Sequence, residues 1–196
     1  MARRPKIYLA GPEVFLRQPR EIGARKVAVC ARHGLEGRFP LDAEIDLAGL
    51  SLREQGLAIF RANEALIAAC DALIANLTPF RGPGMDAGTA YEIGFMRGLG
   101  RPVFGYTNAD ALFFERTRDF LGDRLVPRPG DPAAAFEDEH QMALEQFGLV
   151  DNLMIDAAII ESGGAVIRKA AEPAGRYTDL AAFEACVAQA AAALIA

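Results

Sequence analysis

The sequence predicts one α/β domain over residues 1–196, a three-layer sandwich of the flavodoxin or Rossmann type around a five-stranded, mostly parallel sheet. Two observations support this prediction. Short apolar runs alternate with segments of helical spacing through the first half of the chain, as in a parallel sheet covered by helices on both faces. In addition, the unbroken apolar run Leu73–Leu77 is typical of a strand that is buried on both sides.

The elements of the first half follow from these runs and from the residues that end them. Gly-Pro ends the first apolar run and Thr-Pro ends the third, and a glycine follows closely after two of the helical segments. We expect strands at Lys6–Ala10, Leu35–Phe39, Asp71–Leu77 and Arg101–Thr107, and helices at Gln18–Arg32, Leu52–Cys70 and Gly88–Leu99, with Gly56 as a point where the second helix could divide.

The second half of the chain is less regular. A surface excursion is expected over about residues 108–140, because Arg124–Ala135 is rich in Pro, Gly and charge. The patterns at Ala143–Ile160 and Leu180–Ile195 indicate helices, the latter as a C-terminal helix over about residues 179–195. The short apolar run Ala165–Ile167 is the expected fifth strand.

Composition excludes several classes of function. The net charge is −5, the basic residues are dispersed and there is no tryptophan, so we expect no nucleic-acid partner. No apolar run approaches the roughly 18–20 residues of a membrane span, so we expect a cytoplasmic protein without membrane contact. The three cysteines are scattered and without CxxC spacing, which favours small core hydrophobes over disulfides or a zinc site. We expect neither a metal nor a cofactor.

The chemistry is expected beyond the carboxyl ends of the strands, where open parallel sheets bind ligands. The loop Gly11–Phe15 follows the first strand and the loop Pro79–Asp86 follows the third, so the two should meet. Tyr8 would lie close to the second loop. Arg81-Gly82-Pro83-Gly84 resembles a phosphate loop only superficially, and no GxGxxG follows the first strand, which argues against an NAD-binding domain.

The loop leads into a helix start that carries two carboxylates. Asp86 suits an N-cap, and Glu92 then falls in about the first turn, where the helix dipole favours an ionised carboxylate. An ionised carboxylate can attack the anomeric carbon of a sugar. On composition alone, however, an exposed first-turn acid is the commoner explanation of Glu92, and a strand tyrosine with its hydroxyl in solvent is the commoner explanation of Tyr8.

Four segments, in this order along the chain, resemble the nucleoside 2-deoxyribosyltransferase family. They include the Phe-Arg-Gly and Gly-Thr-Ala variants that are similar to its kinetoplastid-like branch. The matching segments are Lys6–Phe15, Cys70–Gly82, Asp86–Gly94 and Phe147–Ile155. Against the compact family pattern, the excursion and the tail beyond Arg168 are longer, which leaves base access and assembly open.

The resemblance implies a ping-pong transfer of 2-deoxyribose between nucleobases through a covalent intermediate on Glu92. Its substrates would be deoxynucleosides and free nucleobases, and each site of a homodimer or larger homo-oligomer would be completed by a neighbouring subunit. The implied roles are Glu92 as nucleophile, Tyr8 as its hydrogen-bonding partner, Asp86 near the 5′-hydroxyl, Asn152 and Met154 from the neighbour, Asn63 at the base, and Gly11, Phe15 and Arg81 in the substrate-binding loops.

Three interpretations therefore remain open from the sequence. A hydrolase of the same fold, acting on deoxynucleosides or their 5′-monophosphates, is the first alternative. Asp86 argues against the phosphorylated substrate, because a carboxylate repels a phosphate dianion but accepts a hydrogen bond from a free hydroxyl. The second alternative is a non-catalytic nucleoside-binding module, which would need no ionised glutamate. For the segment Val150–Ile160, simple packing on the sheet is the commoner explanation without the resemblance.

Overall fold

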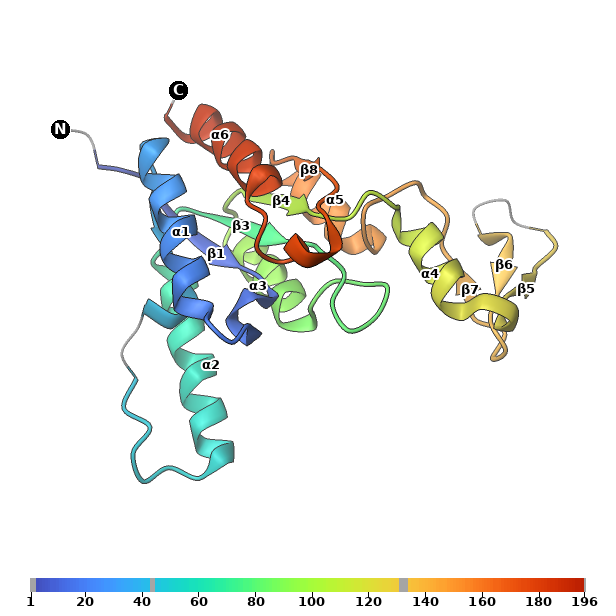
Figure 1. The fold of residues 1–196 in the computed structure, drawn as a ribbon, viewed down its shortest axis with the longest axis horizontal. Coiled ribbons are helices and arrows are strands. Elements are labelled where there is room, and N and C mark those ends of the chain that lie inside the picture. Colours follow the sequence, from blue (N-terminus) through green and yellow to red (C-terminus); the bar gives the residue numbers. More distant parts are fainter. Residues whose placement is uncertain (1–2, 43–44, 131–133, 196) are drawn as a thin grey trace.

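The computed structural model describes residues 3–42, 45–130 and 134–195. Its centre is a five-stranded sheet in which every pairing is parallel, with strand order β2-β1-β3-β4-β8. Figure 1 shows this sheet in the body of the molecule. The strands are β1 (Lys6–Ala10), β2 (Glu36–Arg38), β3 (Ala72–Asn76), β4 (Val103–Thr107) and β8 (Val166–Arg168). The predicted fold class is confirmed, including the fifth strand, β8, at the edge of the sheet.

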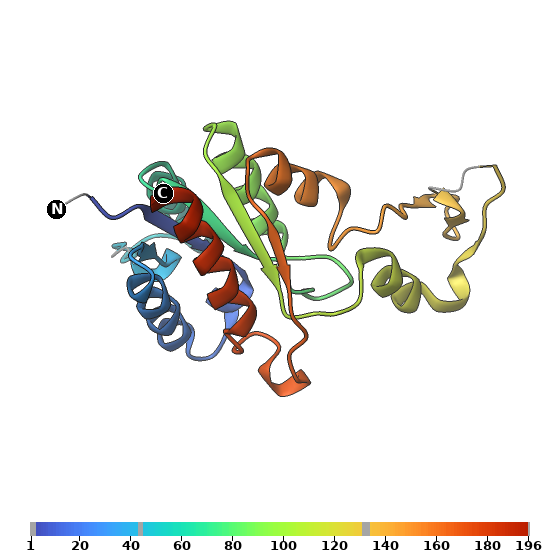
Figure 2. The ribbon, with the colours of Figure 1, turned by 90° about the horizontal axis from the view of Figure 1, so that it is seen from above.

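Helices cover both faces of the sheet and make the three layers seen from above in Figure 2. One face packs on α1 (Pro19–Arg32) and α6 (Ala181–Ile195) through a cluster that includes Val29 and Phe183. The other face packs on α2 (Leu52–Ala68), α3 (Ala87–Gly98) and α5 (Leu153–Glu161). The three cysteines are buried, free and part of these clusters, as predicted for small core hydrophobes.

Strand register brings the functional loops together. Ala10 pairs with Ala75 and Asn76 pairs with Tyr106, so β1, β3 and β4 end side by side. Every residue of β3 and of β4 is buried, as expected for central parallel strands. The short 3₁₀ helix η1 (Pro12–Phe15) therefore lies beside the loop that follows β3. The other 3₁₀ helices within the described residues are η2 (Pro40–Asp42), η3 (Gly122–Arg124) and η5 (Pro173–Gly175).

The helix α2 runs without interruption through Gly56, so the division considered there does not occur. Ser51 begins it with a capping box, in which its side chain accepts from the amide of Glu54 and Glu54 accepts in return. This reciprocal cap fixes the start of the helix at Leu52, and the helix then continues through the residues on both sides of Gly56. Figure 1 shows the N-terminal part of α2 projecting away from the body.

The largest difference from the prediction lies between β4 and α5. Ala143–Ile160 is not one helix: Ala143–Leu144 forms a strand, β7, and the helix begins only at Leu153. Gly148, with φ of 70°, interrupts the segment, and Asn152 caps α5 by accepting from the amide of Met154. Apolar residues recur at about three-residue spacing on both sides of this break, so the sequence pattern resembled that of a single helix.

The predicted excursion is an arm, which we define as residues 108–151. It contains α4 (Phe113–Leu121), η3, and a small antiparallel sheet of β5 (Val126–Pro127), β6 (Phe136–Glu137) and β7. Figures 1 and 2 both show it standing clear of the body. Among the described residues, no helix is long and apolar enough to cross a membrane.

Candidate active site

Tyr8 and Glu92 meet at the carboxyl edge of the sheet. Tyr8 is fully buried on the face covered by α2 and α3, and its hydroxyl donates a 2.6 Å hydrogen bond to Glu92 Oε1. Glu92 itself is half-buried on α3. The simpler explanations are therefore wrong for both residues, because neither the tyrosine hydroxyl nor the carboxylate is an ordinary solvent-exposed group.

The position of Glu92 corrects the electrostatic prediction. α3 begins at Ala87, so Glu92 lies in the second turn, beyond the first turn in which the helix dipole acts. Burial raises the pKa of Glu92 to about 7; the hydrogen bond from Tyr8 and the charge of Lys26 lower it, and the charge of Asp86 raises it. Burial, and not the helix dipole, therefore determines the direction of the pKa shift, and the carboxyl group titrates near neutral pH.

Asp86 is the N-cap of α3, as predicted. One carboxylate oxygen accepts from both the amide and the hydroxyl of Thr89, each at 2.9 Å. These bonds fix the carboxylate at the start of the helix. Its charge raises the pKa of Glu92, so the two carboxyl groups lie close enough to interact.

Phe15 and Arg81 form an aromatic stack with Phe80. The rings of Phe15 and Phe80 are stacked with centroids 5.3 Å apart. The guanidinium of Arg81 lies 4.5 Å from the centroid of Phe80 and 5.2 Å from that of Phe15. Phe15 is 58% exposed, so the stack offers a flat apolar surface to a ligand. The two loops thus meet as the strand order requires.

Asn63 lies on the continuous helix α2 and still faces the body. It lines a cavity of about 580 Å³ together with Phe15, and neither Tyr8 nor Glu92 is among the described residues that line it. The next residue, Glu64, accepts a hydrogen bond from Tyr91, which precedes Glu92. The structure thus places Asn63 beside Phe15 in one cavity. It connects Asn63 to Glu92 only through the hydrogen bond between their chain neighbours Glu64 and Tyr91.

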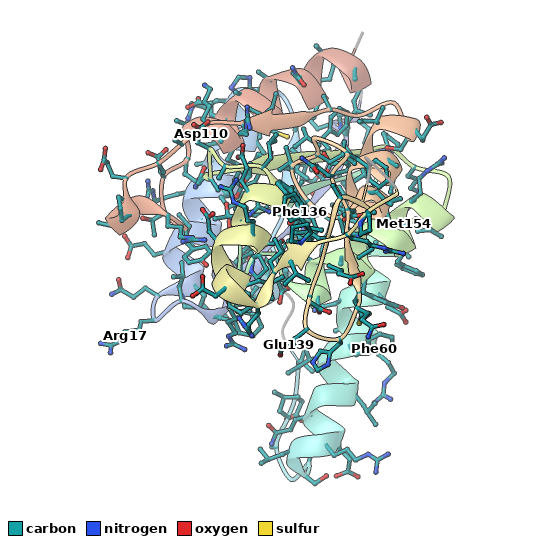
Figure 3. The ribbon with its side chains drawn as sticks, turned by 90° about the vertical axis from the view of Figure 1, so that its right-hand side faces the viewer. Arg17, Phe60, Asp110, Phe136, Glu139 and Met154 are labelled. Carbon is teal, nitrogen blue, oxygen red and sulfur yellow. The ribbon has the colours of Figure 1, made fainter. Side chains whose placement is uncertain are left out.

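Asn152 and Met154 stand apart from the other predicted residues. Asn152 caps α5 and donates a 2.9 Å hydrogen bond to Glu145, and Met154 is 69% exposed. Figure 3 shows Met154 at the surface. Within the described residues of this single chain, no hydrogen bond connects either residue to Tyr8, Asp86 or Glu92.

A buried polar network that no sequence pattern predicted lies behind Gly11. Glu13 Oε1 accepts from Lys26 at 2.8 Å, from Asn76 at 3.0 Å and from Tyr106 at 2.8 Å, and both charged side chains are buried. A Cβ on Gly11 would lie 2.0 Å from Glu13 Oε2, so only glycine fits there. Lys26 on the apolar face of the first predicted helix was the available signal, since a buried lysine needs an acidic partner.

Fold and site together define an α/β protein with a carboxylate-based site at the carboxyl edge of a parallel sheet. Among the described residues, no group of three His, Cys, Asp or Glu side chains is placed to hold a metal ion. The chain belongs to the nucleoside 2-deoxyribosyltransferase family, whose model matches residues 7–154.

Individual proteins are also similar to this chain. An uncharacterized protein of Schizosaccharomyces pombe is 32% identical over 169 residues, which are 83% of this chain and 80% of that protein. A 2-deoxyribosyltransferase from Leishmania mexicana is 28% identical, with a TM-score of 0.54 over 77% of this chain and 85% of that one. A conserved protein from Enterococcus faecalis V583, 24% identical over 85% of this chain and 92% of that one, has the same TM-score and shows the fold.

Proposed function

We propose that this protein exchanges the base of 2′-deoxynucleosides, with Glu92 as a covalent nucleophile. The observation that carries the proposal is the hydrogen bond from buried Tyr8 to Glu92, in a family of nucleoside deoxyribosyltransferases. The hydroxyl orients one carboxylate oxygen and leaves the other available for attack. The 2-deoxyribosyltransferase from Leishmania mexicana supports the same substrate class.

The proposed reaction has two balanced steps. In the first, a carboxylate oxygen of Glu92 bonds to C1′ of the sugar as the bond from C1′ to the base nitrogen breaks, and the base leaves with a proton from solvent. In the second, a nitrogen of another base attacks C1′, loses its proton and releases the carboxylate. Both steps pass through an oxocarbenium-like transition state. The exposed stack of Phe15, Phe80 and Arg81 is a surface for the planar base.

The direct test is base exchange. The protein is incubated with deoxyinosine and free adenine, and the products are separated by chromatography. Deoxyadenosine is expected if the glycosyl group passes to a second base. Release of hypoxanthine without deoxyadenosine would instead identify a hydrolase, and an unchanged mixture would identify a binding module.

Unphosphorylated nucleosides are expected to be the better substrates. Asp86 is held at the start of α3 by Thr89, where its carboxylate would repel a 5′-phosphate and accept from a 5′-hydroxyl. We expect kcat/KM for deoxyadenosine to exceed that for deoxyadenosine 5′-monophosphate by at least about tenfold, equivalent to about 1.4 kcal/mol. Equal values of kcat/KM for the two substrates in parallel assays would exclude this role of Asp86.

The pH dependence of the reaction should report Glu92. Attack requires the ionised form, so kcat/KM is expected to rise with pH through the raised pKa of about 7 and to fall below it. The hydrogen bond from Tyr8 lowers that pKa, so Tyr8→Phe should move this acid limb to higher pH. Tyr91→Phe, which removes the neighbouring bond to Glu64, is the matched control and should leave the limb in place. An unmoved limb in Tyr8→Phe would contradict the assignment.

A second copy of the chain is proposed to complete each site. Asn152 and Met154 match the family segment but lie at the surface, away from Glu92. Large apolar side chains are exposed on both the body and the arm, among them Phe60, Tyr91, Phe120, Met142 and Phe147. A two-fold pair would bury such surfaces and deliver Asn152 to the partner's site, two sites at a time.

Mixing two inactive variants tests this assembly. Glu92→Ala and Asn152→Ala are each expected to be impaired, and an exchanged mixture should regain about a quarter of the sites, because each mixed dimer combines one intact pair. Glu92→Ala mixed with Asp86→Ala is the control, since both residues come from the same copy and no site is restored. An active monomer, detected by light scattering at assay concentration, would exclude the proposal.

A further inference from the structure

A second cavity lies where the arm joins the body. It has a volume of about 620 Å³, which is in the range of small-molecule sites. Its walls come from the loop after β3, the residues after β4, the helix α4 and the segment before α6. Figure 3 looks onto this end of the molecule, with Asp110 labelled. Tyr8, Asp86 and Glu92 are not among the described residues that line it, and Arg81 is the residue that it shares with the stack of Phe15 and Phe80.

The charges around this cavity are unbalanced. Its described lining includes three guanidinium groups, those of Arg81, Arg116 and Arg176, and only one carboxylate, that of Asp110. Burial lowers the pKa of Arg116, and the nearby charge of Arg176 lowers it further, although Asp151, Asp156 and Glu115 oppose both effects. Like charges thus face a common space, and an anion placed between them would relieve the repulsion.

The three arginines differ in the donors that they have left. Arg116 uses four of its five N–H donors: it donates to the carbonyls of Pro83, Ala111 and Val150 and forms an ion pair with Asp151. It therefore holds the cavity walls together. Among the residues that the structure describes, Arg176 makes one hydrogen bond through its guanidinium, at 3.2 Å to Pro79 O. Arg81 makes none within the described residues and lies over Phe80.

Apart from Asn108, the rest of the described lining is made of small or apolar residues. Pro79, Pro83, Phe120 and Pro173 contribute rings to the walls beside the charged groups. A free inorganic anion would leave these surfaces in contact with water. An organic molecule that carries a phosphate would use both parts of the cavity, the guanidinium donors for the phosphate and the rings for the organic group.

We propose that this cavity binds a phosphorylated small molecule of about nucleotide size, with its phosphate held by Arg176 and Arg81. Arg116 shapes the site and adds charge without needing to contact the ligand. The site shares Arg81 with the stack of Phe15 and Phe80, but it requires neither Glu92 nor base exchange.

Titration calorimetry at low ionic strength tests the proposal with adenosine 5′-monophosphate, adenosine and inorganic pyrophosphate as probes. The monophosphate is expected to bind, and Arg176→Gln should weaken it at least about tenfold, because a charge-assisted hydrogen bond is lost. Asp110→Asn removes the opposing charge and should tighten binding a few-fold.

Arg97→Gln is the matched control for net charge. Arg97 is exposed on α3 and does not line the cavity, so its variant should bind within about twofold of the wild type. Pyrophosphate binding that depends on Arg176 and equals that of the monophosphate would support the phosphate contact and assign no role to the apolar walls. Equal monophosphate affinity in Arg176→Gln and Arg97→Gln, with both variants folded, would overturn the proposal, as would adenosine binding as tightly as its monophosphate.

Discussion

Glu92→Ala is expected to lose base exchange by several orders of magnitude while the protein stays folded. No other group can form the glycosyl ester if Glu92 is the nucleophile, so no residual pathway replaces it. The fold should tolerate the change, because burial raises the pKa of Glu92 and its ionised form therefore opposes folding at neutral pH. Initial rates of deoxyadenosine formation, with circular dichroism as a check of folding, measure the effect.

Glu64→Ala provides the comparison. Glu64 lies on α2 next to the same region and accepts a hydrogen bond from Tyr91, so the variant removes a neighbouring carboxylate without removing the nucleophile. It should retain most of the activity. If Glu92→Ala kept more than about a tenth of the wild-type rate, the loss would be under about 1.4 kcal/mol and the covalent role would be excluded.

Lys26→Met is expected to lower the free energy of unfolding by about 3–5 kcal/mol. Lys26 and Glu13 are both fully buried and 2.8 Å apart, so the variant leaves a carboxylate in the core without a counter-charge. The remaining bonds from Asn76 and Tyr106 reach the same oxygen and do not neutralise it. Urea denaturation measures the change.

Two further variants make this prediction specific to the buried pair. Arg32→Met removes an exposed ion pair with Glu184 and should cost no more than about 1 kcal/mol. Adding Glu13→Gln to Lys26→Met removes the orphaned charge and should recover part of the loss, because Asn76 and Tyr106 can still donate to the amide oxygen. A cost for Lys26→Met no larger than that of Arg32→Met would show that the buried pair does not stabilise the fold.

The fold was predictable where local pattern and tertiary packing agree. β1 and β3 are continuous apolar runs ended by proline-containing turns, and the structure has both strands at those positions. The pattern at Ala143–Ile160 failed because helical spacing does not reveal a break at a left-handed glycine, Gly148. A two-residue strand such as β7 depends on its pairing with β6, and two residues are too few to carry a sequence pattern that would predict a strand.

The candidate site was predictable to the level of residues but not of their electrostatics. Asp86 as an N-cap follows from its position before an apolar helical segment, and the meeting of Phe15 with Arg81 follows from parallel strand order. The raised pKa of Glu92 did not follow, because it depends on burial beneath neighbouring helices. Glu13 was missed for the same reason: its partners Lys26, Asn76 and Tyr106 come from three separate elements.

The arm affects the conformational entropy of folding the body. It leaves the body after β4 and returns at α5, so Thr107 and its partner Arg168 can pair only after the whole arm has been enclosed as a loop. The entropy of closing such a loop grows only with the logarithm of its length, about 0.6 kcal/mol for each doubling. Insertions or deletions within the arm therefore change the stability of the central sheet little, and its length can drift through evolution while the sheet and the residues at its edge stay as they are.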